Sequence, residues 1–251
     1  MYLSPDLLDA YGASDDHLQA LIEDVNIFAK RVISGQSHEE LDIETRYGCA
    51  GALRKLLSIL GLPASSWFHA MTLLDVYCYL GGSTDPNDIP SLCTGIAIIV
   101  AKFEGADVDL LTRTVKSEDL MREVYRKEIE ILDVIQFRVR CPTFCSWFNI
   151  FLPRLQLAIN DEQKYTLLFH LILHYLERFV IKNVCIPDWK LRRIAQGLIT
   201  VACVETVNRF GLGITHPRQL PEPLRLTILS CIGVGMETLV NDFEMVTSLL
   251  D

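Results

Sequence analysis

The stretch Asp88-Ile-Pro-Ser-Leu-Cys-Thr-Gly-Ile-Ala-Ile-Ile-Val-Ala-Lys-Phe-Glu-Gly105 is the most hydrophobic helical segment of the chain. Its residues from Leu92 to Ala101 are apolar on every side of a helix, and a helix of this kind has to be buried. Pro90 is tolerated in the first turn, and Gly105 offers a C-terminal cap. The sequence therefore predicts a central buried helix around which the other helices pack.

A lysine lies at the end of this helix, where Ala101 is followed by Lys102, Phe103 and Glu104. A buried ammonium group is costly unless other groups accept its hydrogen bonds. Lys102 is therefore the first candidate functional residue, and its acceptors have to come from other parts of the chain.

The composition is that of a globular protein with one large core or two modest ones, since 50% of the 251 residues are hydrophobic. A formal net charge of −9 argues against a nucleic-acid partner, which would need a basic face to replace the counterions of the phosphates. We expect the partner to be another protein or a small molecule.

The N-terminal residues 1–6 lack the basic and apolar regions of a signal peptide, and no apolar run approaches the roughly 18 residues that span a bilayer. The eight cysteines are scattered without a C-x-x-C pair, as expected of reduced core thiols rather than a zinc site. These features predict a protein of the cytosol or nucleus that is neither secreted nor membrane-embedded.

Apolar residues recur at helical spacing along the chain, and no strand-like alternation competes with them. The pattern predicts an N-terminal helix and then two sets of five helices. The predicted ranges are 17–33, 43–60, 64–80, 88–105, 107–115, 117–136, 143–159, 162–181, 191–210, 222–232 and 235–249. We therefore predict an all-α fold with an N-terminal segment and helix (1–41) and two domains of similar size (42–140 and 141–251).

The two predicted domains look like divergent copies of one unit. Aligning residues 194–205 with residues 92–103 places Gly197 on Gly95, in two apolar helices that hold the same position in each half. The counterpart of Lys102 in this alignment is Val204, so only the first copy carries the lysine.

Catalytic motifs are not found: the sequence has no G-x-S-x-G, no H-E-x-x-H and no glycine-rich phosphate loop. His170, His174 and Glu177 have the spacing of three metal ligands on one helical face, but no Glu-x-x-His pair elsewhere completes such a site. A metal-dependent α-helical enzyme is kept as an alternative. We expect no metal, no cofactor and no enzymatic activity.

Four motifs occur in the order and at the spacing of the cyclin box: Thr45-Arg46, Leu73-Leu-Asp75-Val-Tyr, Ala101-Lys102-Phe-Glu and Arg126-Lys-Glu128-Ile-Glu-Ile-Leu-Asp-Val-Ile-Gln-Phe137. The chain resembles cyclins through residues 43–152, and is most similar to the D-type-like cyclins encoded by gammaherpesviruses. The resemblance implies two tandem five-helix cyclin boxes after an N-terminal helix. It also implies a non-catalytic subunit that binds and activates a cyclin-dependent kinase to drive the cell cycle, in the nucleus and cytoplasm of an infected host cell.

The resemblance assigns roles to individual residues. Lys102 and Glu128 would pair and hold the loop before the kinase C-helix, the lysine donating to carbonyls and the glutamate accepting from amides. Without the resemblance, the pair is an ordinary surface salt bridge worth at most about 1 kcal/mol. Arg46 and Asp75 would form an internal ion pair between the first two helices of the box. An apolar seat for the kinase C-helix would be formed by Ile99, Phe103, Leu132, Phe137 and Val139.

Cyclins capture Arg-x-Leu motifs of substrates and inhibitors in a groove on the first helix of the box, and the matching positions here depart from the family pattern. Cys49, Ala52, Lys55 and Pro90 occupy four of these positions, with Ala52 in place of a tryptophan and Lys55 in place of a glutamate. Loss of the aromatic wall and repulsion by the lysine predict weak or no binding of Arg-x-Leu inhibitors. The alternative is a shifted register in which Tyr47 and Leu53 rebuild the groove.

Cyclin-like folds also occur in general transcription factors that grip DNA, and an adaptor of that type is a further alternative. Such a protein would need a basic face, which a chain of net charge −9 is not expected to supply. We therefore predict a heterodimer with a cyclin-dependent kinase, with no nucleic-acid or membrane partner.

Overall fold

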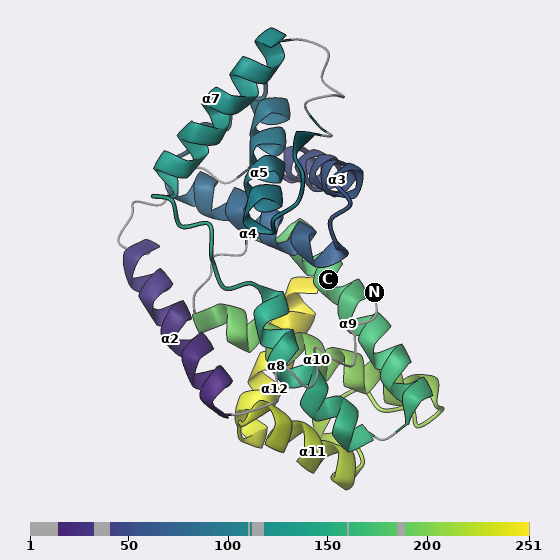
Figure 1. Ribbon diagram of the computed structural model, residues 1–251. Helices are drawn as coiled ribbons and strands as arrows, with labels where there is room; N and C mark the ends of the chain where they lie inside the picture. Colours follow the sequence, from purple (N-terminus) through teal and green to yellow (C-terminus); the bar gives the residue numbers. More distant parts are fainter. Residues whose placement is uncertain are drawn as a thin grey trace. The chain divides into compact units, whose positions relative to one another are not determined.

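The computed structural model describes residues 15–32, 41–109, 111, 118–159, 161–184 and 189–250. These residues form ten α-helices, one turn of 3-10 helix and no strand (Figure 1). The helices are α2 (Asp15–Val32), α3 (Ile43–Ile59), α4 (Ala64–Tyr79), α5 (Ile89–Phe103), α7 (Glu118–Val134), α8 (Phe144–Ile159), α9 (Glu162–Lys182), α10 (Trp189–Arg209), α11 (Glu222–Ile232) and α12 (Met236–Leu250). The all-α prediction is confirmed. The helix predicted at 107–115 lies largely outside the described residues.

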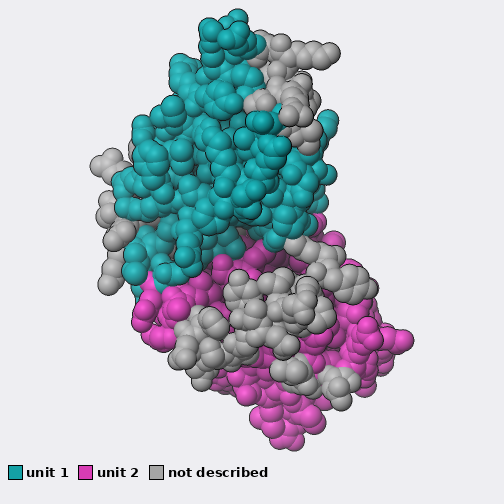
Figure 2. Space-filling view, viewed as in Figure 1, with its two compact units in different colours: residues 1, 24–143, 184–187 teal, residues 2–23, 144–183, 188–251 magenta. Residues whose placement is uncertain are grey.

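The chain divides into two compact units, which Figure 2 shows in different colours. Unit 1 is built on residues 24–143, and unit 2 on residues 144–183 and 188–251. Unit 1 therefore contains α3, α4, α5 and α7, and unit 2 contains α8 to α12, while α2 is divided between the units.

The central helix of unit 1 is α5, which is buried from Ser91 to Ala101 apart from the partly exposed Thr94. Pro90 lies in its first turn, and Gly105 adopts a φ of +73° just after its end. The N–H of Ala106 donates to the carbonyl of Ala101 at 2.8 Å, which satisfies one of the last carbonyls of the helix. Burial, first-turn proline and glycine cap are all confirmed for this stretch.

The same pattern of helix contacts occurs in both units. In unit 1, α5 packs against α3, α4 and α7; in unit 2, α10 packs against α8, α9 and α12. Each of these two helices approaches a neighbour at a glycine. A Cβ on Gly95 would lie 2.9 Å from the Ile131 side chain of α7, and one on Gly197 would lie 2.4 Å from the Asp242 carbonyl oxygen of α12. The side-by-side packing of α5 and α7, seen in Figure 1, therefore depends on a residue without a side chain.

Unit 2 contains an ion pair with a buried carboxylate between its two most extensively packed helices. Asp242 of α12 is fully buried and accepts a hydrogen bond from Nε of Arg193 of α10 at 2.7 Å. Burial raises the pKa of Asp242, although Arg193 and Arg192 act in the opposite direction. Val204, the counterpart of Lys102, is buried in α10, so unit 2 carries an apolar side chain at the position where unit 1 has its lysine.

Seven of the eight cysteines lie among the described residues, and all seven are free, while Cys185 lies outside them. Burial raises the pKa of Cys141 and of Cys203 to about 12. Both side chains are therefore protonated thiols at neutral pH, which fits the prediction of reduced core residues.

Within the described part of the chain, no single helix combines the length and the apolar composition needed to cross a bilayer; α11 and α12 meet both conditions only as a pair, and that pair is bent by 87°.

Candidate functional site

The lysine at the end of α5 is paired with a glutamate of α7. Lys102 Nζ lies 2.6 Å from Glu128 Oε1 and 2.9 Å from Oε2, so both carboxylate oxygens accept from the ammonium group. The Lys102 side chain is 47% exposed and that of Glu128 9% exposed. The expected cost of a buried ammonium therefore does not arise, because the lysine reaches solvent while its partner is the more buried of the two.

A stripe of α7 surrounds this pair with apolar side chains. Tyr125, Glu128, Ile129 and Leu132 follow one another at the spacing of one helical face. Ile129 is 60% exposed, Tyr125 is half-exposed and Leu132 is partly buried. The Lys102 ammonium lies 5.9 Å from the centroid of the Tyr125 ring, within reach of a cation–π contact. Of this stripe, the sequence predicted Glu128 and Leu132 but missed Tyr125 and Ile129.

The end of α5 exposes an aromatic ring but not the isoleucine one turn before it. Phe103 is half-exposed, as expected of a contact residue. Ile99, which was predicted to lie in the apolar seat, is only 3% exposed, so the part of that prediction that needs its side chain at the surface is wrong. The reason lies in the packing of α5, which buries every residue from Gly95 to Ala101 between its neighbours.

The chain leaves α7 through an unusual turn that presents a second aromatic ring. Gln136 and Phe137 have φ values of 54° and 57°, a left-handed conformation that side-chain-bearing residues rarely adopt. The N–H of Phe137 donates to the carbonyl of Leu132 at 2.7 Å, as in a helix cap that usually contains glycine. The turn leaves the Phe137 ring 67% exposed. Val139, two residues on, is partly buried, and its carbonyl lies 2.8 Å from Nε2 of His69.

These side chains define one surface, which we call the unit 1 face. It consists of Lys102, Phe103, Tyr125, Glu128, Ile129, Leu132 and Phe137. A bonded pair of opposite charges stands among apolar and aromatic groups that water reaches. The aromatic and aliphatic groups are of the kind enriched at the centre of protein–protein interfaces, where aromatic anchors supply most of the binding energy, whereas charged pairs lie more often at the rim.

A second network of charges holds α7 in place behind this face. Lys127 is 2% exposed, and its Nζ lies 2.9 Å from Asp88 Oδ2 and 2.9 Å from Glu130 Oε2. The Tyr77 hydroxyl donates to Glu130 Oε1 at 2.6 Å, and burial, followed by this carboxylate, raises the pKa of Tyr77. The network ties α4, the start of α5 and α7 together. It thereby fixes the rotation of α7 that turns the neighbouring Glu128 toward Lys102.

The ion pair implied for Arg46 and Asp75 is present. The Arg46 guanidinium donates to both carboxylate oxygens of Asp75, with Nη2 lying 3.0 Å from Oδ2. Their side chains are 3% and 1% exposed. The pair joins α3 to α4 inside unit 1 and lies away from solvent, so its contribution is structural.

The residues matched to the Arg-x-Leu groove do not share one surface. Ala52 and Lys55 of α3 are exposed, and so is Pro90 at the start of α5. Cys49, the fourth matched residue, is completely buried and cannot line a groove. The alternative register needs Tyr47 and Leu53 to line the groove. Leu53 is equally buried, so only Tyr47 could line a rebuilt groove.

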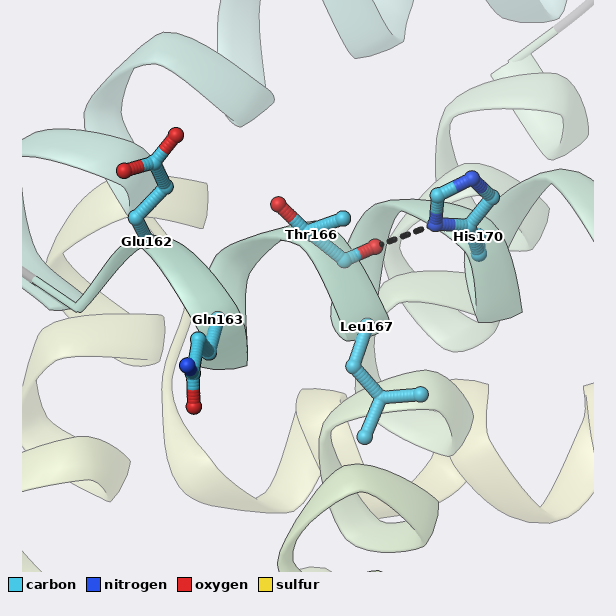
Figure 3. A pocket seen from close by; sticks show the side chains of 5 residues that line it. All are labelled: Glu162, Gln163, Thr166, Leu167 and His170. Atoms are coloured by element: carbon cyan, nitrogen blue, oxygen red, sulfur yellow. Dashed lines mark hydrogen bonds between the residues drawn. The ribbon is translucent and has the colours of Figure 1, made fainter.

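A shallow hollow on unit 2 contains one of the predicted metal-ligating residues (Figure 3). It is lined by α9 alone, through Glu162, Gln163, Thr166, Leu167 and His170. The His170 Nδ1 lies 2.7 Å from the Thr166 carbonyl oxygen, to which it donates. Figure 3 shows Glu162 and His170 at opposite ends of this row of side chains. Nowhere in the described part of the chain do three His, Cys, Asp or Glu side chains converge as metal ligands. The alternative site at His170, His174 and Glu177 is therefore not assembled.

Comparison of the sequence with models of known protein families gives no match, and comparison with curated proteins gives none either.

Proposed function

We propose that the chain is a cyclin-type regulatory subunit, which binds a cyclin-dependent kinase through the unit 1 face and activates it. The observation that carries the proposal is the bidentate pair of Lys102 and Glu128, 2.6 and 2.9 Å apart, among exposed aromatic and aliphatic side chains. These two residues come from separate helices and belong to the motifs that resemble the cyclin box.

We also propose that the all-α fold consists of two tandem cyclin boxes. The support is the shared contact pattern of α5 and α10, each of which packs against the first, second and last helix of its own unit. Gly95 and Gly197, which the sequence aligned, both lie where the central helix meets the last helix. A repeated unit explains why these positions agree, and the second copy would have lost the lysine because it does not contact the kinase.

A kinase is active when its C-helix glutamate pairs with the lysine of the ATP site and its activation loop is moved aside. A partner that binds only this arrangement shifts the kinase toward it without performing any chemical step. The unit 1 face suits this task, because apolar groups can cover a helix while Lys102 and Glu128 offer a donor and an acceptor to backbone groups. The chain would therefore be an activator and not an enzyme.

The charge of the chain favours this proposal over the DNA-binding class. A net charge of −9 opposes association with phosphates. We propose a protein that acts in the nucleus and cytoplasm, of the kind encoded by gammaherpesviruses.

The experiment that tests the function is a reconstitution from purified proteins. The chain alone should transfer no phosphate to histone or to a retinoblastoma-type peptide. Added to a monomeric cyclin-dependent kinase, it should raise the rate of phosphorylation strongly, because the kinase alone rarely populates the active arrangement. Equal rates with and without the chain, across a panel of such kinases, would contradict the proposal.

A second prediction concerns inhibitors that need an Arg-x-Leu foothold. We expect such a peptide not to bind in the micromolar range, because Ala52 offers no aromatic wall and the exposed Lys55 repels the arginine of the motif. An aromatic anchor of this kind is commonly worth about 2 kcal/mol or more. Calorimetric titration measures the binding.

The matched variant for this prediction restores both missing features. Ala52→Trp combined with Lys55→Glu should gain measurable binding, since both positions are exposed on α3 and can accept larger side chains. Low-micromolar binding of the peptide to the unchanged chain would show that the prediction is wrong.

A further inference from the structure

A histidine beneath the unit 1 face contacts two separate parts of it. His69 of α4 is 9% exposed. Its ring lies 5.2 Å from the Phe103 ring, centroid to centroid, with the two planes at 78°. Its Nε2 lies 2.8 Å from the carbonyl oxygen of Val139, in the segment that follows α7. One side chain thus joins the end of α5 to the segment that leads away from Phe137.

The neighbouring contact reinforces this connection. Ser66, almost one turn before His69 on α4, donates to Oε2 of Glu104 at 2.7 Å. Glu104 directly follows Phe103, so α4 holds two consecutive residues at the end of α5. Phe103 is held instead by its ring, which packs edge to face against the imidazole.

The charge state of His69 follows from its surroundings. Burial lowers the pKa of His69, whereas the Val139 carbonyl and the Glu104 carboxylate act in the opposite direction without reversing the shift. Glu104 is the charged group that acts on the ring from α5, and the Val139 carbonyl faces it from the segment after α7. At neutral pH the ring is therefore uncharged. Since a neutral imidazole carries a single N–H, the bond to Val139 requires that hydrogen on Nε2.

We propose that His69 is a positioning residue of the unit 1 face, whose neutral ring holds Phe103 and the segment around Val139 in the arrangement that a protein partner contacts. That this partner is a kinase rests on the proposed function. A bound partner covers Phe103 and removes His69 further from water, which disfavours the imidazolium form. Binding is therefore linked to the loss of a proton whenever His69 is protonated in the free chain.

The sign of the pH dependence follows from this linkage. Above pH 6.5, the ordinary value for histidine, the ring is neutral in the free and in the bound chain, so affinity does not depend on it. As the pH falls through the lowered pKa of the free chain, a proton has to be released on binding, and affinity falls. A difference of one pKa unit between the free and bound states would weaken binding about tenfold.

The first test compares the pH profiles of two chains. Affinity for a purified cyclin-dependent kinase is measured by calorimetry between pH 7.5 and pH 5, for the wild type and for His69→Gln. The glutamine amide can occupy the place of Nε2 and donate to Val139, but it does not titrate. We expect the two chains to have similar affinities at pH 7.5. Between pH 7.5 and pH 5, the affinity of the wild type should fall by up to about tenfold more than the affinity of His69→Gln. Identical pH profiles would contradict the proposal.

A second measurement needs no partner. Proteases should cleave the segment after α7 faster when His69 no longer holds it, because cleavage requires local opening. We expect His69→Phe, which keeps a ring but cannot donate to Val139, to be cut after Phe137, Arg138 and Arg140 several times faster than the wild type, with His69→Gln close to the wild type. His69→Asn, whose amide is too short to reach Val139, serves as a second variant if the phenylalanine is not accommodated.

The two measurements separate this proposal from the proposed function. Equal cleavage of all four chains would overturn the positioning role of His69 whether or not a kinase binds. Faster cleavage of His69→Phe and His69→Asn, together with no kinase binding by the wild type, would support the tie between Phe103 and Val139 and overturn the kinase as the partner.

Discussion

Replacing Lys102 by glutamate is expected to weaken kinase binding at least about 30-fold. The change places a second carboxylate beside Glu128, whose oxygens now lie 2.6 and 2.9 Å from the lysine ammonium. When a partner covers this rim, two like charges are desolvated together and a donor to the partner is missing. Losses of this kind amount to about 2–5 kcal/mol, or at least about 30-fold in affinity. Calorimetry or surface plasmon resonance with a purified kinase measures the loss.

Lys164 provides a matched control for this variant. It lies in unit 2, and its side chain is 51% exposed, close to the 47% of Lys102. It too bonds to a carboxylate, at 2.9 Å, and lies over an aromatic ring, 5.6 Å from the centroid of Phe210. Lys164→Glu should therefore leave kinase binding unchanged. Wild-type binding by Lys102→Glu would contradict the assignment of the unit 1 face.

The charge-reversed double variant separates the two roles of the pair. Lys102→Glu combined with Glu128→Lys restores an attraction between α5 and α7, so the chain should regain stability that the single variant loses by placing a second carboxylate beside Glu128, which is only 9% exposed. Kinase binding should not return, because donor and acceptor have exchanged places.

Replacing Asp75 by asparagine is expected to cause the largest loss of stability. The substitution removes the charge that neutralises the Arg46 guanidinium, and both side chains are almost fully buried, at 3% and 1% exposure. Breaking a buried pair by changing one partner typically costs about 3–5 kcal/mol. Urea unfolding combined with hydrogen exchange should locate the loss in α3 and α4. Unit 2 should be affected less, since the pair lies within unit 1.

The pair of Arg122 and Glu118 is the control, because it has the same charges on the surface of α7. Its side chains are 72% and 83% exposed, with Nη2 lying 3.0 Å from Oε1. Glu118→Gln should change stability by no more than about 0.5 kcal/mol. Equal effects of Asp75→Asn and Glu118→Gln would contradict the structural role assigned to the buried pair.

Helix positions and the central helix could be predicted from the sequence because they depend on local patterns. The apolar run from Leu92 to Ala101 requires burial wherever it lies, and Pro90 and Gly105 mark the ends of a helix through their own backbone preferences. The pairs Lys102–Glu128 and Arg46–Asp75 join distant residues, and they were found through the resemblance to cyclins rather than through spacing.

The sequence could not predict which side of α5 and α7 remains exposed. Ile99 and Ile129 are the same residue type on neighbouring helices, yet the first is 3% and the second 60% exposed. The difference arises because α5 has neighbours on several sides, whereas the stripe of α7 that carries Ile129 faces solvent. A helical-face count from Glu128 would have found Tyr125, which lies three residues before it, and from Tyr125 would have found Ile129, which lies four residues further on.

Side chains that act through tertiary contacts were even harder to identify from the sequence. Lys127 stands beside Glu128 in the sequence, but its burial with Asp88 and Glu130 depends on how α7 packs against α5. His69 lies 70 residues from Val139, and nothing in the surrounding sequence indicates their contact. Such connections require the fold, since they join segments that are adjacent only in space.

The most direct measurement is the phosphorylation rate of a purified monomeric cyclin-dependent kinase titrated with the chain. A regulatory subunit that stabilises the active arrangement of the kinase should raise the rate until one chain is present per kinase, after which the rate should stay constant. A rate that does not change at any concentration of the chain, with each kinase of the panel, would contradict the account.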